Sequence, residues 1–504
     1  MKLLSLLPLL TLMAFPQTVY AHGFGERYDL PVPLWLYLLG AGITVALSFV
    51  MAIAFIKRKT DEKQPGRMNL LNHFAGKILI HSASIFTLQL LGLVVFFTII
   101  FAGVFGNPNP SLNISPTIIW VIWWVGFAYV SALIGNIWAA INPWNTLYAW
   151  TEHLFNRVAP DKQLSLNRAY PTSWGVWPAI LLFFAFAWFE LAYPTPAIPY
   201  RITQSILIYS VITWMGMAIF GRAIWLHHGE VFSMVFTVLA KFAPTQVSVT
   251  DTIICNTCPL DCQNSHGRCI DCWECFAKVE DDAKVINLLP HGTGLMGTHA
   301  DSSSMVIFVV LLLSTVTFDG LMATTFYWEE LYTPLFQTIN DATTVITIGL
   351  TACLFVLLGA YLITISLIRK IAGGKIRHLA KAFVFTLVPI ALAYHLAHYF
   401  SFLIIQGQNI IPLLSDPFGL GWNLFGTSDF QINIGLVGAR FAWLFAVAVI
   451  VIGHVIAVYL SHHMALQIYQ GRRNAIKSQY PMLLLMVGYT VLSLWILSQP
   501  IVEP

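Results

Sequence analysis

Charged residues are scarce in this sequence. Of its 504 residues only 10% are Asp, Glu, Lys or Arg, and 57% are hydrophobic, whereas soluble domains carry about 25% charged residues. The formal net charge is +3, so the chain lacks the basic excess that a nucleic-acid partner requires. It also lacks low-complexity tracts and a convincing internal repeat. These absences exclude a soluble globular protein and a nucleic-acid binder, and they leave a chain solvated largely by lipid.

Apolar runs of about 20 residues, the length that crosses a bilayer, recur along the chain. The run at 231–244 is shorter, and we expect it to be interfacial or re-entrant. The predicted fold class is an all-α polytopic membrane protein of about ten transmembrane helices, with a Cys-rich loop between spans five and six. The spans are predicted near 33–56, 79–104, 117–141, 175–195, 203–225, 304–324, 343–368, 382–406, 437–461 and 481–500.

The first 21 residues have the pattern of a secretory signal. Lys2 is followed by an apolar stretch, and Val19-Tyr20-Ala21 fits a small-x-small cleavage site. Cleavage there would make His22 the first residue of the mature protein; an uncleaved signal anchor is the alternative.

Lys and Arg gather in alternate loops, at 57–77, 157–168, 369–381 and 472–477, while the loops 105–116, 325–341 and 407–436 contain none. By the positive-inside rule the basic loops are cytoplasmic and the mature N-terminus is outside. The predicted division is a signal peptide (1–21), membrane helices with the interfacial segment (22–244), a Cys-rich cytoplasmic loop (245–303) and further membrane helices (304–504).

Six of the seven cysteines fall within one short segment. Paired Cys-x2-Cys turns bring thiolates to a metal, and a reducing cytoplasm disfavours disulfides. The pattern therefore indicates a metal or redox site, and it leaves structural zinc and an iron–sulfur cluster open, although the ferredoxin spacing ending in Cys-Pro is missing. An inverted local topology would favour disulfides instead. His266, His291 and His299 are spare nitrogen ligands nearby. The cysteines are Cys255, Cys258, Cys262, Cys269, Cys272 and Cys275.

A second candidate site lies inside the membrane. His395 and His398 stand on one face of span eight, where ionisable groups are costly and indicate function. At 1.5 Å per residue, Asp319 of span six and Glu190 of span four reach compatible depths toward the outer side. Two imidazoles and two carboxylates suit zinc, iron or manganese, and the metal would generate a hydroxide nucleophile. Interhelical hydrogen bonding is the alternative role for each residue.

Two more histidines extend these possibilities. His454 in span nine lies deeper and could line an inner part of the site or, with His398, ligate haem. His22, as a mature N-terminus, could chelate copper through its α-amine and ring nitrogen, an arrangement that resembles the copper histidine brace.

Several stretches resemble a family of bacterial multi-pass membrane proteins, the fenitrothion hydrolases. The resemblance implies a bacterial inner membrane location and hydrolysis of an organophosphate triester with release of a nitrophenol. The Cys-rich loop is a departure from that family's pattern. The matching stretches are His22–Pro33, Gly135–Trp144, Phe318–Gly320, the His395/His398 stretch through Gln408, and Gly453–Val455.

Three functional hypotheses follow. In the first, a metal hydroxide held by the intramembrane residues attacks a small apolar phosphorus ester that enters from lipid. In the second, the chain handles metal ions or electrons: His22 captures copper outside, intramembrane histidines relay it, and the cysteines receive it inside. In the third, the Cys-rich loop is a zinc knuckle that docks a protein partner.

Overall fold

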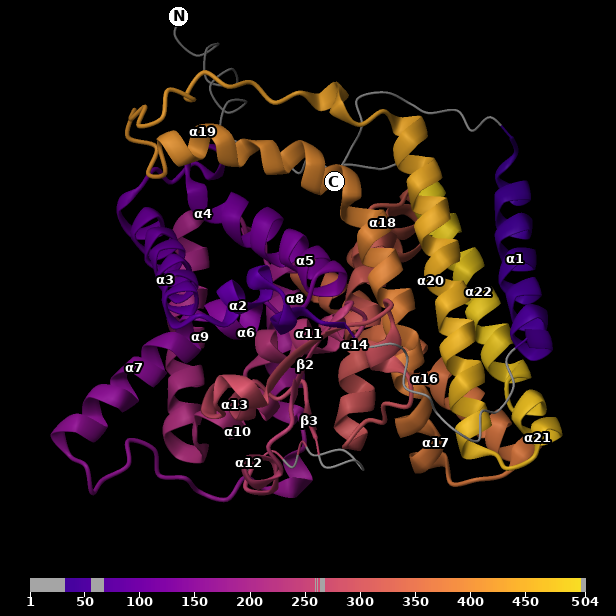
Figure 1. The fold of residues 1–504 in the computed structure, drawn as a ribbon. Coiled ribbons are helices and arrows are strands. Elements are labelled where there is room, and N and C mark those ends of the chain that lie inside the picture. Colours follow the sequence, from indigo (N-terminus) through magenta and orange to yellow (C-terminus); the bar gives the residue numbers. More distant parts are fainter. Residues whose placement is uncertain (1–31, 56–67, 259, 261, 263–267, 500–504) are drawn as a thin grey trace, which may run out of the picture.

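The computed structural model describes residues 32–55, 68–258, 260, 262 and 268–499. In this part of the chain ten helical segments are long and apolar enough to cross a membrane, which confirms the predicted fold class (Figure 1). The predicted signal peptide and His22 lie outside the described residues. The spans are α1 (Leu34–Phe55), α3 (Ser82–Phe105), the segment Ile114–Leu133 (α4, a π-helical middle and α5), the segment Thr172–Leu191 with α8 (Trp177–Leu191), α9 (Pro199–Phe220), α14 (Ser303–Met322), α16 (Ala342–Ala372), the segment Ile376–Ser415, α20 (Ala439–Ile468) and the segment Arg472–Ser498.

The eighth span is bent. It joins α17 (Ile376–Phe383), α18 (Val388–Gln406) and α19 (Ile410–Ser415), and Figure 1 shows α19 running across one end of the bundle. The tenth span joins α21 (Arg472–Lys477) and α22 (Tyr480–Ser498). Shorter helices connect the spans: α2 (Phe74–Ile80), α6 (Trp138–Ile141), α7 (Pro143–Val158) and α15 (Thr333–Ile339).

Helix ends follow local chemistry as well as hydrophobicity. The Asp341 carboxylate accepts the Thr344 N–H at 2.8 Å and begins α16. Gly373, at φ +82°, follows the last residue of α16 in a backbone conformation that glycine adopts without strain. The hydroxyl of Ser302 caps α14 by accepting the Met305 N–H. Such caps fix where a hydrophobic run stops being helical.

Two spans are enclosed by the others. In the most apolar window of α14 72% of residues are buried, and in that of the eighth span 89%, against 11% for α16. Helix α18 packs against α14, α20 and the π-helical segment Thr117–Gly126. Polar side chains on α14 and α18 therefore meet protein rather than lipid, which removes most of the cost of placing them at membrane depth.

The segment expected to be interfacial or re-entrant is packed into the bundle. Helices α10 (Arg222–His228) and α11 (Val231–Ala240) meet at a bend of 65°, as in a broken span or a re-entrant loop. Val231, Val235 and Phe236 are buried in the main core. Glu230 lies at the bend, fully buried, and caps α11.

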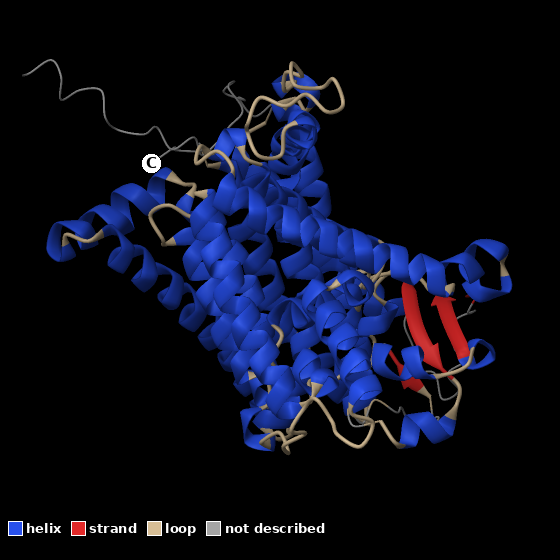
Figure 2. Cartoon of the chain, turned by 90° about the vertical axis from the view of Figure 1, so that its left-hand side faces the viewer, coloured by secondary structure: helices blue, strands red, loops and turns tan. Residues whose placement is uncertain are grey.

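The Cys-rich segment forms a small antiparallel sheet with two short helices (Figure 2). The strand order is β1 (Met68–Asn69), β4 (Lys284–Leu288), β2 (Thr245–Val249) and β3 (Cys269–Ile270), with helices α12 (Thr252–Asn256) and α13 (Trp273–Lys278). Its core is separate from that of the bundle and includes Val247, Val249 and Phe276 together with buried cysteines. We refer to this unit, residues 245–289 with β1, as the cysteine subdomain. Strand β1 comes from the chain after the first span, which the sequence did not predict.

The cysteine subdomain lies at the basic end of the bundle. In Figure 1 α12 and β3 lie at the same end as α17 and α21, which carry several of the basic residues, while α19 lies at the opposite end. This placement agrees with the expectation that the cysteines share a side with the basic loops.

Candidate metal centre and intramembrane polar cluster

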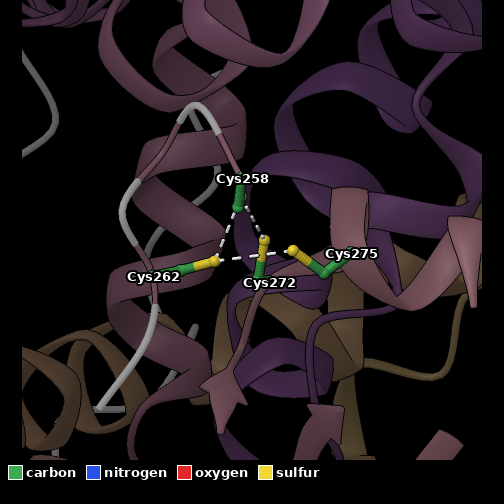
Figure 3. A group of neighbouring side chains, drawn as sticks. All are labelled: Cys258, Cys262, Cys272 and Cys275. Atoms are coloured by element: carbon green, nitrogen blue, oxygen red, sulfur yellow. Dashed lines mark hydrogen bonds between the residues drawn. The ribbon is translucent and has the colours of Figure 1, made fainter. Parts of the chain in front are cut away.

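Four cysteines of the subdomain converge on one point. The Sγ atoms of Cys258, Cys262, Cys272 and Cys275 all lie within 4.8 Å of one another (Figure 3). Cys258 Sγ is 3.2 Å from Cys262 Sγ and 3.7 Å from Cys272 Sγ, and Cys262 Sγ is 3.7 Å from Cys275 Sγ. Four sulfurs bound tetrahedrally to zinc at about 2.3 Å stand about 3.8 Å apart. These thiols, the four-thiol group, could therefore hold a single metal ion.

The local fold explains the convergence. Asp251 begins α12 by accepting the Ile253 N–H at 2.8 Å, and Cys258 and Cys262 follow that helix. Cys272 is the N-cap of α13, and Cys275 lies in that helix. Asp271 links β3 to Cys272 at φ +54°, and its N–H donates to the Val247 carbonyl at 2.8 Å. The chain after α12 thus presents two thiols, and the first turn of α13 presents the other two.

The remaining two cysteines of the segment adjoin this group. Cys269 Sγ lies 3.3 Å from Cys262 Sγ and 3.5 Å from Cys275 Sγ. The backbone N–H of Cys269 donates to Cys255 Sγ at 3.2 Å. Both side chains are buried. All seven cysteines of the chain are free thiols, so the structure contains no disulfide in this segment.

Hydrogen bonds within the cluster separate the thiol pKa values. A hydrogen bond from Cys262 lowers the pKa of Cys272 to about 6, and the same interaction raises the pKa of Cys262. Burial raises the pKa of Cys269 to about 11. The hydrogen bonds thus favour the thiolate form of Cys272 over that of its neighbours, and a bound cation would convert the other ligands to thiolates because metal binding releases their protons.

No histidine belongs to the four-thiol group. His291 is exposed, with Nε2 3.3 Å from the Leu133 carbonyl, and His299 lies beside His378 with ring centroids 6.1 Å apart. His266 lies outside the described residues. The ligand set among the described residues is thus sulfur alone, which favours zinc or iron over magnesium or calcium.

The intramembrane residues also come together, on α14 and α18. His398 Nε2 donates to Asp319 Oδ2 at 2.8 Å, and the hydroxyl of Tyr399 donates to the same oxygen at 2.5 Å. His395 lies one turn earlier, its ring centroid 4.8 Å from that of Tyr399, and its Nε2 is buried without a hydrogen-bond partner. Glu190 on α8 lies close enough to Asp319 for their charges to interact.

This polar cluster is walled by aromatic rings. The ring of His395 lies 6.2 Å from that of Trp124 and 6.0 Å from that of Tyr129, centroid to centroid. Among the described residues, the group of ligand atoms close enough to hold a metal ion is the four-thiol group of the cysteine subdomain, and no set of three from the intramembrane polar cluster meets the same distance limit. The cluster is thus arranged as a carboxylate with imidazole and phenol donors rather than as a compact chelate.

His454 has a local role in the structure. On α20 its Nδ1 donates to the Ile450 carbonyl at 2.8 Å, and its ring faces Tyr489 at 5.9 Å. Its buried Nε2 has no partner. His398, which was considered as the second haem ligand, is hydrogen-bonded to Asp319.

Tyr399 and Glu230 are the polar residues that the sequence analysis missed. Tyr399 directly follows His398, so a phenol next to the paired histidines was the available signal. Glu230 follows a His-His-Gly turn and precedes an apolar run, but glutamate is not one of the residues that mark an N-cap in a sequence.

The fold and these sites define a multi-pass membrane protein with a small thiol-rich subdomain that could bind a metal ion. No known protein family, curated protein or solved structure matches this chain.

Proposed function

We propose that this protein is a membrane-embedded metalloprotein that binds zinc through Cys258, Cys262, Cys272 and Cys275. The observation that carries the proposal is the convergence of these four sulfurs within 4.8 Å. Four thiolates without a water position are typical of structural zinc. The cysteine subdomain has few apolar side chains in its core, and small folds of this kind commonly depend on a metal for stability.

Iron is the alternative occupant. A single iron fits the same tetrahedron and would make the subdomain an electron carrier, as the metal-handling hypothesis requires. A cubane iron–sulfur cluster places irons and sulfides between the thiolates and needs a wider spacing than the 3.2–3.7 Å seen for adjacent sulfurs. Copper binding in that hypothesis requires His22 to be the first residue of the mature protein, so identifying the mature N-terminal residue tests it.

The test is the metal content of the detergent-purified, full-length protein. We expect zinc in the wild type and less zinc per chain in Cys258→Ser and in Cys272→Ser. Cys353→Ser is the matched control, because Cys353 is a free thiol on α16 outside the subdomain. Iron with a visible charge-transfer spectrum and a reversible reduction would replace the zinc proposal by electron transfer.

A second candidate function is hydrolysis at the intramembrane cluster. The 2.8 Å bond from His398 Nε2 to Asp319 supports it, because a carboxylate paired with an imidazole can act as a general base. That base would take a proton from water as the water oxygen attacks phosphorus and the phenolate leaves. The aromatic walls suit an apolar aryl ester, and the family resemblance points to organophosphate triesters.

Turnover of a chromogenic phosphotriester by protein in lipid nanodiscs tests this candidate. Asp319→Asn and His398→Gln should each lower kcat about 10²–10⁴-fold, the typical contribution of a positioned base. Asp341→Asn, which changes an exposed capping carboxylate on α16, is the control. Equal turnover in all three variants would remove the cluster from the mechanism.

A further inference from the structure

We propose that the cysteine subdomain holds two metal ions that share two bridging thiolates. The proposal rests on the metal centre proposed above and extends it to all six cysteines. The first ion has Cys258, Cys262, Cys272 and Cys275 as ligands. The second ion, which the four-thiol group does not account for, would have Cys255 and Cys269 as terminal ligands and would share Cys262 and Cys275 with the first.

Sulfur–sulfur distances outline the second site. Cys262, Cys269 and Cys275 form a triangle of sulfurs with edges of 3.3, 3.5 and 3.7 Å. These edges match those of the first group, and both resemble the edge of about 3.8 Å expected around zinc. One edge, between Cys262 and Cys275, belongs to both sets. Two tetrahedra that share an edge are the geometry of a two-metal centre with two bridging sulfurs.

Cys255 is the proposed fourth ligand of the second ion. Its sulfur accepts the Cys269 backbone N–H at 3.2 Å, which holds it next to one member of the sulfur triangle. An N–H that donates to sulfur is stronger when the sulfur is a thiolate, because such a bond is charge-assisted. Cys255 and Cys269 are 2% and 0% exposed. In a one-metal centre these two thiols would serve as small apolar side chains of the subdomain core, whereas the two-metal centre uses both as ligands.

The charges of the proposed centre are reasonable. Each of the six thiols releases a proton on binding, and the two divalent ions leave the centre with two net negative charges. Because two thiolates are shared, the centre carries less net negative charge than two separate four-thiolate sites would carry.

The test is zinc stoichiometry in the full-length protein, purified in detergent and dialysed against zinc alone. We expect two zinc ions per chain in the wild type and in Cys353→Ser, and one in Cys255→Ser and in Cys269→Ser. One zinc in the wild type overturns this inference and leaves the proposed metalloprotein intact. No zinc overturns both.

Loading with ¹¹³Cd keeps the test independent of whether a variant folds. The wild type should give two cadmium resonances in the thiolate range that are coupled through the bridging sulfurs. Two uncoupled resonances, or a single one, contradict shared thiolates. Iron with acid-labile sulfide in place of two zinc ions also overturns the proposal.

Discussion

Replacing Glu230 by glutamine should destabilise the bundle, because this carboxylate holds together three helices. It is fully buried, and each of its oxygens accepts one backbone N–H of α11 and one side-chain donor. Oε1 accepts the Phe232 N–H at 3.2 Å and the hydroxyl of Tyr209 on α9. Oε2 accepts the Ser233 N–H at 2.7 Å and the side-chain amide of Asn142, the N-cap of α7, at 3.1 Å.

The magnitude follows from this pairing. Whichever oxygen becomes the amide nitrogen, one backbone N–H in the first turn of α11 loses its acceptor, which costs about 1–3 kcal/mol when buried. The hydrogen bonds on the remaining oxygen lose their ionic character, which costs about 0.5–1.5 kcal/mol each. Glu230→Gln should therefore lower the free energy of unfolding by about 2–6 kcal/mol.

Reversible denaturation in mixed detergent micelles measures this change. Glu329→Gln, at an exposed carboxylate between α14 and α15, is the matched control and should stay within about 0.5 kcal/mol of the wild type. A Glu230→Gln variant as stable as this control would refute the reasoning, since it would mean that the carboxylate does not bind α7, α9 and α11 together.

Three further predictions concern the two sites. Gly320→Ala should lower the free energy of unfolding by about 1–3 kcal/mol, because the added methyl group would lie 2.0 Å from the Tyr394 hydroxyl oxygen. Thermal unfolding should show that Tyr394→Phe restores the stability of this variant. If it does not, the strain lies elsewhere. Asp271→Val should weaken zinc binding about 5–30-fold, because the backbone angle φ +54° costs a β-branched residue about 1–2 kcal/mol. Asp271→Gly, which adopts this angle without strain, should not weaken it. Competition with a chromogenic chelator measures both affinities, and equal affinities would contradict a role for this turn. Chelating the metal should make the cysteine subdomain protease-sensitive while the spans remain protected, and unchanged cleavage would show that the metal does not stabilise it.

The membrane architecture could be predicted because it depends on run length alone. Span six was expected at 304–324 and is Ser303–Met322, and span seven at 343–368 is Ala342–Ala372. The small sheet could not be predicted, since β1 and β3 have two residues each and β1 pairs with β4, more than 200 residues later. Such short, distant pairings leave no periodicity to read.

The sequence indicated which types of site to expect better than it indicated which residues form each site. The fixed helical rise placed Asp319 and His398 at compatible depths, and the two side chains are hydrogen-bonded in the structure. Cysteine spacing suggested a metal site built from Cys-x2-Cys pairs. The group contains one such pair, Cys272 and Cys275, and joins it to Cys258 and Cys262, which have three residues between them. Which thiols converge depends on the turn at Asp271 and on β-pairing, and neither is visible in spacing.

The most direct test of the account is the metal bound by the purified protein, measured together with its cysteine variants. The account predicts zinc that is retained in Cys353→Ser and lost when Cys258, Cys262, Cys272 and Cys275 are all replaced by serine. Metal that persists after all four replacements, or a wild-type protein with reduced cysteines and no metal, would contradict it.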